Sequence, residues 1–394
     1  MAVVVSVFSR PQVVARRSSR HRPCPLGYGG MARPTNPSDG VQTVPSDTSV
    51  EFKRSQLPVS QFKNLVFEGG GVKGITYAGA LQVLEQQNIL ADVKRVAGTS
   101  AGAITAALVA LGATSQDVAH IIGGTRFREF MDDSFGVLRD LDRLVHDYGW
   151  YKGDAFSAWM QKQVYVLCQN SEITFGELAQ KASQSNSRFK ELYVVGTNLT
   201  MQMPVIYSAE MTADFPVWEA VRVSMSIPLF FAAMKLYRAK QVLVDGGVTW
   251  NYPLDLFDDR KYLVNQNAFT TPDYTRYDEN HVYNKETLGL RVDTVDEIQA
   301  EKDSWRLPPQ QIDDFFDYIR SLVGYMTDTA NKMHLHKNDW HRTIILDASG
   351  VKSTEFDLTD AKVQMLVQNG RRGATGYFQW FNDPNANPIP LNRI

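Results

Sequence analysis

Short apolar runs bounded by glycine or polar residues are typical of buried strands. The chain has such runs at 64–68, 93–97, 191–197, 204–208, 241–244, 288–292 and 342–346. Longer stretches between them predict helices, at 75–87, 101–111, 217–226, 312–332 and 359–377. Strands that alternate with helices predict an α/β domain with a largely parallel sheet covered on both faces.

The first 61 residues differ in composition from the rest. Residues 1–38 contain six arginines and no aspartate or glutamate, and Pro, Ser and Gly are frequent. Such a composition cannot bury a core. We therefore expect a disordered tail and linker over 1–61. Two kinds of alternative remain. The segment can have a targeting role, as a transit peptide or as a secretory signal in residues 2–8, or translation can start at Met31.

A polar stretch rich in Asn, Asp and Pro interrupts the pattern at 259–283, where we expect an excursion at the surface. Before it, residues 62–258 form the predicted catalytic core. After it, residues 284–382 resume the pattern and are assigned to the same α/β domain. Residues 383–394 are expected to form a tail.

Composition narrows the function classes. The net charge of −2 gives no reason to expect nucleic acid as a partner. Two cysteines, Cys24 and Cys168, argue against a disulfide framework. No apolar run approaches the roughly 20 residues of a membrane-spanning helix, so any membrane contact is expected to be peripheral. The expected location is the cytoplasm or a membrane surface.

Three short glycine-containing segments follow predicted strands in one order. They are Glu68–Gly74 (EGGGVKG), Gly98–Gly102 (GTSAG) and Asp245–Gly247 (DGG). Each is common alone, but together they supply an oxyanion cradle, a nucleophilic serine and a base. No histidine lies in or beside them. The combination points to acyl-ester hydrolysis by a Ser/Asp dyad instead of a Ser/His/Asp triad.

The second segment places Ser100 in a sharp turn between a strand and a helix. A serine in such a turn is held at the end of the sheet, and the cramped backbone requires small neighbours such as Gly98 and Gly102. The helix that follows directs its N-terminus at the site and favours developing negative charge. A helix-capping serine in an ordinary tight turn is the alternative.

The first segment can offer backbone N–H groups to an oxyanion. Its glycines are Gly69, Gly70, Gly71 and Gly74. Lys73 adds a positive charge beside them, although an ordinary lysine near a helix start is the alternative. With Gly74, the glycines also fit the G-x-G-x-x-G pattern of a dinucleotide fold. That fold needs an acidic residue after the second strand, where this chain continues into Gly98.

The third segment supplies a carboxylate. Asp245 ends a predicted strand, and Gly246 and Gly247 let the backbone bend so that the carboxylate can approach another group. Asp-Gly is also an ordinary turn signal. An aspartate can activate a serine if it lies within hydrogen-bond reach and is partly desolvated, because desolvation raises its pKa.

Three histidines downstream of Asp245 leave a triad or a metal site as alternatives. His334, His336 and His341 lie among lysine and arginine residues, as on a solvated surface, and no cysteine or patterned carboxylate accompanies them. We therefore expect no catalytic histidine, no metal and no cofactor.

In this order the three motifs resemble those of the patatin-like phospholipases. Further matches are Tyr151–Asp154 (YKGD), Ser224–Pro228 (SMSIP) and Thr287–Arg291 (TLGLR). The resemblance is strong over residues 64–257 and extends weakly to about residue 381. It implies a three-layer α/β/α patatin-like fold with a mostly parallel central sheet.

The resemblance also implies roles for residues. Ser100 corresponds to the nucleophile and Asp245 to the base of a dyad without histidine. Gly69–Val72 correspond to the oxyanion loop, to which the N–H of Ala101 contributes. The family has Arg or Lys where Lys73 stands, and many members have Ala where this chain has Gly247.

We therefore predict a serine lipid acyl hydrolase of the phospholipase A or lysophospholipase type. Its expected partner is a phospholipid or another acyl lipid at a membrane or micelle surface. Two alternatives remain: an acyl thioesterase or acyltransferase on a soluble acyl substrate, and an effector or toxin phospholipase that is silent until a partner protein activates it. Acyl-chain length, headgroup, sn-position and oligomeric state are not predicted.

Overall fold

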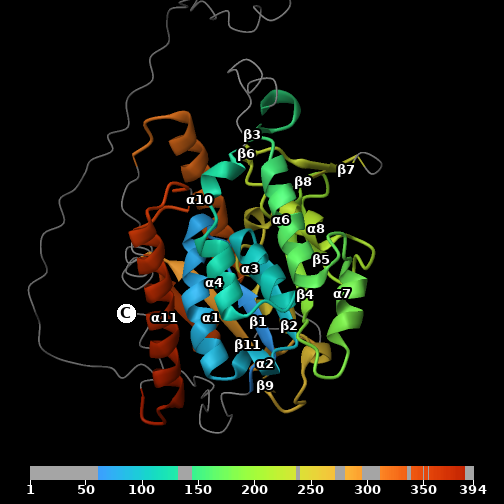
Figure 1. Cartoon of the computed structure of the whole chain (residues 1–394), viewed down its shortest axis with the longest axis vertical. Helices are drawn as coiled ribbons and strands as arrows, with labels where there is room; N and C mark the ends of the chain where they lie inside the picture. The colour runs from blue at the N-terminus through green and yellow to red at the C-terminus, as the bar shows by residue number, and fades with distance from the viewer. Residues whose placement is uncertain are drawn as a thin grey trace, which may run out of the picture. The chain divides into compact units, whose positions relative to one another are not determined.

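An eight-stranded sheet organises the described part of the chain (Figure 1). Its strands are β1 (Asn64–Phe67), β2 (Arg95–Thr99), β4 (Glu191–Asn198), β5 (Met203–Tyr207), β7 (Met234–Leu236), β8 (Gln241–Asp245), β11 (Thr287–Asp293) and β12 (Thr343–Asp347). Their order is β12-β11-β1-β2-β4-β8-β7, and β5 also pairs with β4. The pairs from β12 to β4 are parallel, whereas β5 and β8 are antiparallel to β4, and β7 is antiparallel to β8. The predicted α/β architecture with a mostly parallel sheet is confirmed.

The computed structural model describes residues 61–131, 144–236, 240–270, 280–294, 311–334, 339–348, 350–353 and 355–386. All of these lie within one compact unit, Phe52–Ile394. The predicted tail and linker over residues 1–60 and the predicted tail beyond residue 386 lie outside the described residues, and so does His336.

Helices and short strands connect the sheet strands. The helices are α1 (Thr76–Gln86), α2 (Ile89–Asp92), α3 (Ala101–Ala110), α4 (Ser115–Gly123), α6 (Asp154–Cys168), α7 (Phe175–Ala182), α8 (Val217–Ser224), α10 (Phe315–His334) and α11 (Asp360–Asn382). Two further strand pairs are β3 (Gly149–Tyr151) with β6 (Leu229–Phe231) and β9 (Phe269–Thr270) with β10 (Tyr283–Asn284). α1 packs against both α4 and α11 (Figure 1).

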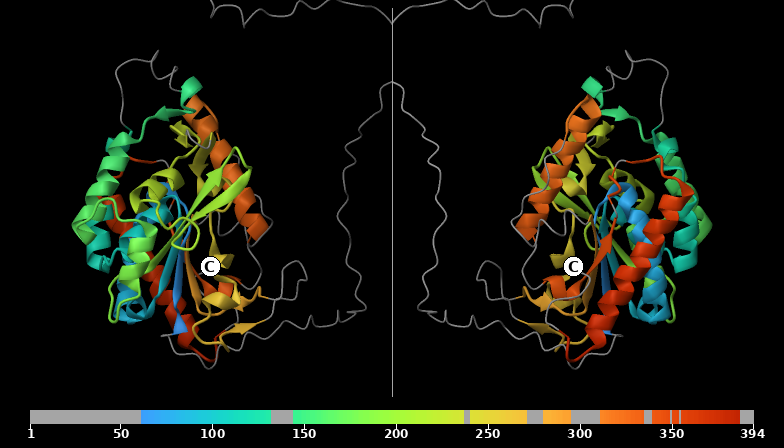
Figure 2. Two further views of the ribbon diagram at one scale, coloured as in Figure 1. Left: turned by 90° about the vertical axis from the view of Figure 1, so that its right-hand side faces the viewer. Right: turned by 90° about the vertical axis from the view of Figure 1, so that its left-hand side faces the viewer.

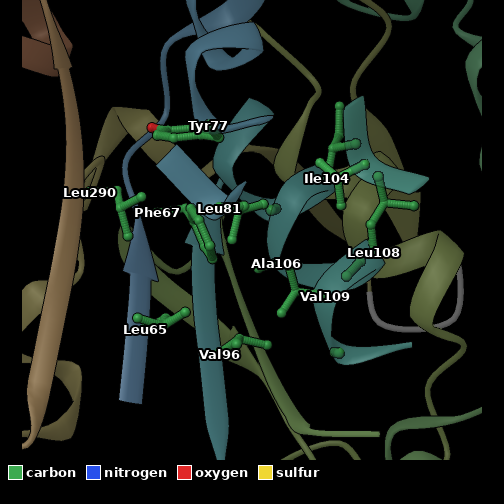
Figure 3. Packing of buried hydrophobic residues seen from close by; sticks show 14 of the residues in the cluster. Leu65, Phe67, Tyr77, Leu81, Val96, Ile104, Ala106, Leu108, Val109 and Leu290 are labelled. Carbon is green, nitrogen blue, oxygen red and sulfur yellow. The ribbon is translucent and has the colours of Figure 1, made fainter. Parts of the chain in front are cut away.

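Strand β1 shows how the sheet is buried on both faces. Leu65 and Phe67 belong to the large hydrophobic core, which includes residues of α1 and α3 (Figure 3). Val66 belongs to a second core with Tyr252 and Leu254. Because alternate strand residues point to opposite faces, burial on both sides requires a continuous apolar run, which is the pattern of 64–68.

Helix α10 lies on the other side of the sheet from most of the helices. Figure 2 shows it in orange, away from the blue and green helices. It contacts the short 3₁₀ segment η4 (Gly246–Val248), which directly follows β8. A C-terminal helix therefore reaches the part of the chain that contains Asp245. Among the described residues, no helix is both long and apolar enough to cross a membrane.

The second strand begins two residues later than expected. β2 starts at Arg95, which pairs with Asn64 of β1 and Glu191 of β4. The amide of Val93 instead donates to the carbonyl of Ile89 at 3.2 Å, closing a turn. An apolar residue in a buried turn cannot be distinguished from a strand residue by hydrophobicity alone.

Helices α4, α6 and α7 were not predicted, although the sequence contains a start signal for two of them. α4 begins at a capping box formed by Thr114 and Asp117, and α7 at one formed by Thr174 and Glu177. In each, the threonine accepts from the third residue of the helix, whose carboxylate in turn accepts from the threonine backbone.

The polar stretch at 259–283 contains packed residues where the structure describes it. Tyr262, Leu263 and Ala268 are buried. Immediately before it, Asp258 is buried in an ion pair with Arg342, with a shortest distance of 2.6 Å. Apart from Val282 and Tyr283, the other described residues of this stretch are exposed or half-buried, and the surface excursion stays a prediction. Residues 271–279 lie outside the described part.

Candidate active site

The sheet topology brings the three glycine-containing segments to one place. The glycine segment directly follows β1, Ser100 directly follows β2, and Asp245 is the last residue of β8. β4 lies between β2 and β8, where Val195 pairs with Thr99 and Gly196 pairs with Asp245. The segments that carry Ser100 and Asp245 are therefore paired with adjacent residues of the same central strand, β4.

Ser100 has a strained backbone. Its φ of 52° and ψ of −124° lie outside the regions that L-amino acids ordinarily adopt, which costs of order 1–3 kcal/mol. The flanking glycines allow close packing: a Cβ at Gly98 would lie 2.3 Å from the carbonyl oxygen of Gly102, and one at Gly102 would lie 2.3 Å from that of Phe67. The small neighbours expected around Ser100 are therefore required sterically.

Asp245 is buried beside Ser100. Its Oδ1 accepts a hydrogen bond of 2.7 Å from the amide of Gly247. Its Oδ2 is buried and accepts no hydrogen bond of ordinary geometry from the described residues. Burial raises the pKa of Asp245 from 3.8 to about 7, although the Gly247 amide and the Ser100 side chain both lower it. Such a carboxyl can take up and release a proton near neutral pH.

The two glycines after Asp245 let the backbone bend closely enough for the Gly247 amide to reach the Asp245 carboxylate. A Cβ at Gly246 would lie 2.3 Å from the carbonyl oxygen of Val195, which is part of β4. A Cβ at Gly247 would lie 2.9 Å from Oδ1 of Asn251 and 3.1 Å from Oδ1 of Asp245. Bulkier residues would displace the backbone amide that binds the carboxylate.

The predicted oxyanion loop lies against Ser100, but not all of its amides are available. A Cβ at Gly69 would lie 3.1 Å from the Cβ of Ser100. The amide of Gly69 donates to the carbonyl of Asn251, and that of Val72 to the carbonyl of Ser353, both at 3.0 Å. In this conformation distant carbonyls therefore already occupy these two amides, and their role in binding an oxyanion stays a prediction.

The amides of Gly70, Gly71 and Ala101 donate to no acceptor in the described part of the chain. Gly71 adopts a left-handed φ of 56°, and a Cβ there would lie 2.0 Å from the carbonyl oxygen of Ser353. Ala101 is the first residue of α3. These three N–H groups are candidates to bind an oxyanion.

Lys73 is buried in the short 3₁₀ segment η2 (Gly71–Ile75), with 7% of its surface exposed. The glycine next to this segment, Gly74, packs against the start of α3: a Cβ there would lie 3.2 Å from the Cβ of Ala101. A role of Lys73 in substrate binding stays a prediction.

A buried polar network behind the glycine loop was not predicted. Glu68 accepts from the side-chain amide of Asn331 at 2.7 Å and from the backbone amide of Val292 at 2.9 Å. Arg291 lies 3.7 Å away, and it lowers the Glu68 pKa, which burial raises. Asn251 donates its side-chain amide to the carbonyl of Gly69 at 3.1 Å. The network ties the loop to β11 and α10. Its members lie far apart in the sequence, so no local sequence pattern could have predicted this network.

No described histidine hydrogen bonds to Ser100 or Asp245. His334 stacks on Trp250, with a ring-centroid distance of 5.1 Å, and lies 3.7 Å from Asp255. His341 stacks on Trp380 at 6.2 Å. Within the described ranges, no group of three or more His, Cys, Asp or Glu side chains is arranged to hold a metal ion.

A narrow apolar slot adjoins the candidate oxyanion donors. Its lining residues are Gly71, Gly74, Ile75, Ala101, Ile104, Thr105, Ile122, Phe127 and Trp159. The slot has a volume of about 10 Å³, the room of a single water molecule. A larger cavity of about 410 Å³, lined by Arg95, Glu191 and Lys261 among others, lies where β2 and β4 begin, at the opposite end from Ser100.

Comparison with known proteins finds similarity to one family model and to several individual proteins. A family model described as patatin-like phospholipase matches residues 65–258, which include Ser100 and Asp245. The uncharacterized protein YqhO of Bacillus subtilis (strain 168) is 31% identical, over 78% of this chain and 94% of its own length. An uncharacterized protein of Acanthamoeba polyphaga mimivirus is 25% identical, over 80% of this chain and 93% of its own. A probable lipid hydrolase of Invertebrate iridescent virus 6 is 25% identical, over 51% and 64%.

Proposed function

The chain belongs to the patatin-like phospholipase family, and on that premise we propose that it is a serine lipid acyl hydrolase with Ser100 as nucleophile and Asp245 as base. The single observation that carries this proposal is the pairing of a strained serine with a buried aspartate whose pKa is raised to about 7. A serine hydroxyl is a weak nucleophile at neutral pH and needs an adjacent base. In the described part of the chain, Asp245 is the titratable group whose pKa the Ser100 side chain affects, which supports its assignment as the base.

In the proposed reaction, Ser100 Oγ attacks the carbonyl carbon of an ester while Asp245 takes its proton. The carbonyl oxygen becomes an oxyanion, which the amides of Gly70, Gly71 and Ala101 would stabilise. The C–O bond to the alcohol then breaks, and Asp245 returns the proton to the leaving oxygen. Water, deprotonated by the same carboxylate, releases the fatty acid and restores Ser100.

The proposed substrate is an acyl lipid, and phospholipase A or lysophospholipase activity is the first choice. In the proposed binding mode, the acyl chain lies against Ile104 and Phe127, which line the apolar slot beside Gly71 and Ala101. In its present volume the slot admits no acyl chain, so side chains at its wall must move when substrate binds. Contact with a membrane or micelle surface would supply the lipid.

The test is fatty-acid release from vesicles of mixed phospholipids. Wild type is compared with Ser100→Ala and Asp245→Asn, and we expect release by the wild type and loss in both variants. Matched controls are Ser208→Ala and Asp92→Asn. Ser208 is a buried serine whose hydroxyl accepts from the amide of Met211, and Asp92 forms a half-exposed ion pair with Lys63. Both controls are expected to retain activity.

Ser100→Ala with undiminished lipid hydrolysis would refute the proposed nucleophile. Loss in Ser100→Ala with full activity in Asp245→Asn would instead refute the dyad and point to another base.

A further inference from the structure

The C-terminal end of α8 contacts the backbone of Ser100. The hydroxyl of Ser224 accepts a hydrogen bond of 2.9 Å from the Ser100 amide and donates one of 2.5 Å to the carbonyl of Val195. Ser224 is fully buried. Among the described side chains, it is the one that hydrogen bonds to the main chain of the strained residue. A hydroxyl that both accepts and donates has a fixed orientation, so it holds Ser100 in place relative to β4.

Two residues later, the same segment contacts the backbone of Asp245. The carbonyl of Ser226 accepts the amide of Asp245 at 2.9 Å. The turn Ser224–Ser226 therefore binds the main chain of both candidate catalytic residues. Its two contacts add to the β4 register in holding the serine and the aspartate side by side.

A buried arginine holds this turn. Arg222 donates to the hydroxyl of Ser226, to the carbonyl of Lys152 at 2.6 Å and to that of Ala232 at 3.1 Å. A Cβ at Gly153 would lie 2.4 Å from this guanidinium group, and Gly153 has a left-handed φ of 78°. Arg222 thus joins two segments that were noted above only as matches to the family: Tyr151–Asp154 and Ser224–Pro228.

We infer that Ser224 is a positioning residue for the reaction, and this inference rests on the proposed roles of Ser100 and Asp245. Its hydroxyl keeps Ser100 in the strained conformation that presents Oγ to the carboxylate, and the turn Ser224–Ser226 sets the spacing of the dyad. The hydrogen bonds of the Ser224 hydroxyl go to Ser100 and Val195, neither of which lines the slot.

Ser224→Ala removes the acceptor from a buried amide. Ser100 can then relax toward an ordinary backbone conformation, which moves its Oγ away from Asp245. A small misplacement of a reacting group can reduce the rate by about 100-fold. We expect kcat to fall by about 10- to 100-fold while KM changes by less than about twofold, because the lost interaction aligns the nucleophile instead of binding substrate.

The experiment measures hydrolysis of 4-nitrophenyl butyrate by the full-length protein, with active sites counted by fluorophosphonate labelling of Ser100. Counting sites removes the effect of misfolded protein. Ser224→Thr keeps the hydroxyl and is expected to recover most of the kcat per site. Ser208→Ala is the matched control, because it also removes a buried hydroxyl that accepts a backbone amide, beyond the end of β5.

A wild-type kcat per labelled site in Ser224→Ala would overturn the inference while leaving the proposed function intact. An equal loss in Ser208→Ala would also overturn it, since the effect would then follow from lost stability alone. A wild type that neither hydrolyses the ester nor reacts at Ser100 would refute the proposed function and the inference with it. Should Ser224→Ala not fold, Ser224→Cys, which retains the volume with a weaker acceptor, takes its place.

Discussion

Ser100 and Asp245 are both held in states that cost folding free energy. Ser100 adopts a backbone conformation that is normally avoided, and Asp245 is buried with one carboxylate oxygen to which no described residue donates an ordinary hydrogen bond. Surrounding contacts must over-determine such states for them to persist, and these states are concentrated at functional sites. At the scale of single residues, the proposed chemistry therefore predicts measurable effects of pH.

The rate should follow the ionisation of Asp245. Its folded pKa of about 7 means that the carboxylate is protonated, and unable to act as a base, below neutral pH. We expect kcat/KM on a soluble ester to fall about tenfold per pH unit below about pH 7 and to level off above it. A pH–rate profile measures this, and an acidic limb near pH 4 would contradict it.

The stability of the protein should show the reverse dependence. Between pH 3.8 and about 7, Asp245 binds a proton in the folded state but not in the unfolded state, so its burial destabilises the fold increasingly as pH rises through this window. Asp245→Asn should therefore raise the free energy of unfolding by up to about 4 kcal/mol above pH 7 and by little near pH 4. Urea denaturation at both pH values tests this, and a stabilisation independent of pH would contradict it.

At the scale of elements, the glycine loop is shaped by segments distant in sequence. The carbonyls of Asn251 and Ser353 hold the amides of Gly69 and Val72, which leaves those of Gly70 and Gly71 at the site. The loop conformation is therefore a property of its packing partners as well as of its glycines.

Gly71→Ala should test this arrangement. The new Cβ would meet the Ser353 carbonyl at 2.0 Å in a left-handed conformation that alanine disfavours. The loop must shift, and loss of an oxyanion donor typically reduces kcat about 10²- to 10³-fold. The control is Gly376→Ala in α11, where a Cβ would meet nothing within 4 Å. A kcat for Gly71→Ala within twofold of the wild-type value would contradict the assignment of the Gly71 amide as an oxyanion donor.

The slot should control the preference for acyl-chain length. Ile104 lies on α3 and is 6% exposed, and Ile104→Ala would enlarge the slot next to Ala101. We expect kcat/KM for long-chain esters to rise relative to butyrate, by about fourfold for each further methylene group admitted. Ile344→Ala, in the core of β12, controls for the lost stability. A chain-length profile identical in the two variants would contradict the proposed acyl site.

At the scale of the whole molecule, a buried ion triad connects segments from the middle and the end of the chain. Arg342 binds both carboxylate oxygens of Asp258, at 2.6 and 2.7 Å, and an oxygen of Asp339 at 2.8 Å. It also donates to the carbonyl of Asn284 at 3.0 Å. The segment before β12 is thus attached to the chain that follows the Asp245 strand.

Arg342→Ala should destabilise the fold by about 3–5 kcal/mol, because it leaves Asp258 buried without its partner. Lys362→Ala, which breaks an ion pair with Glu355 whose side chains are 45% and 29% exposed, should cost less than about 1 kcal/mol. Chemical denaturation compares the two variants. We expect kcat per active site to be unchanged in Arg342→Ala. If Arg342→Ala were as stable as Lys362→Ala, the triad would contribute little to stability.

The sequence by itself determined the α/β class with its mostly parallel sheet, the position of Ser100 in a strand-to-helix turn and the order of the three motifs. These features follow from local physics. The strained turn needs small neighbours within two residues of the serine, and apolar periodicity is set by the geometry of a single helix or strand. The resemblance to the patatin-like phospholipases rests on the same local residues.

Only the tertiary structure decided which amides remain at the site, how Asp245 acquires a raised pKa and what holds Ser100 in place. Each depends on groups far apart in the chain: Ser353 for the Val72 amide, Asn331 for Glu68 and Ser224 for Ser100. Burial and hydrogen-bond occupancy are properties of packing between segments. No local pattern encodes them, because the partner of each group is chosen by the register and layering of the sheet.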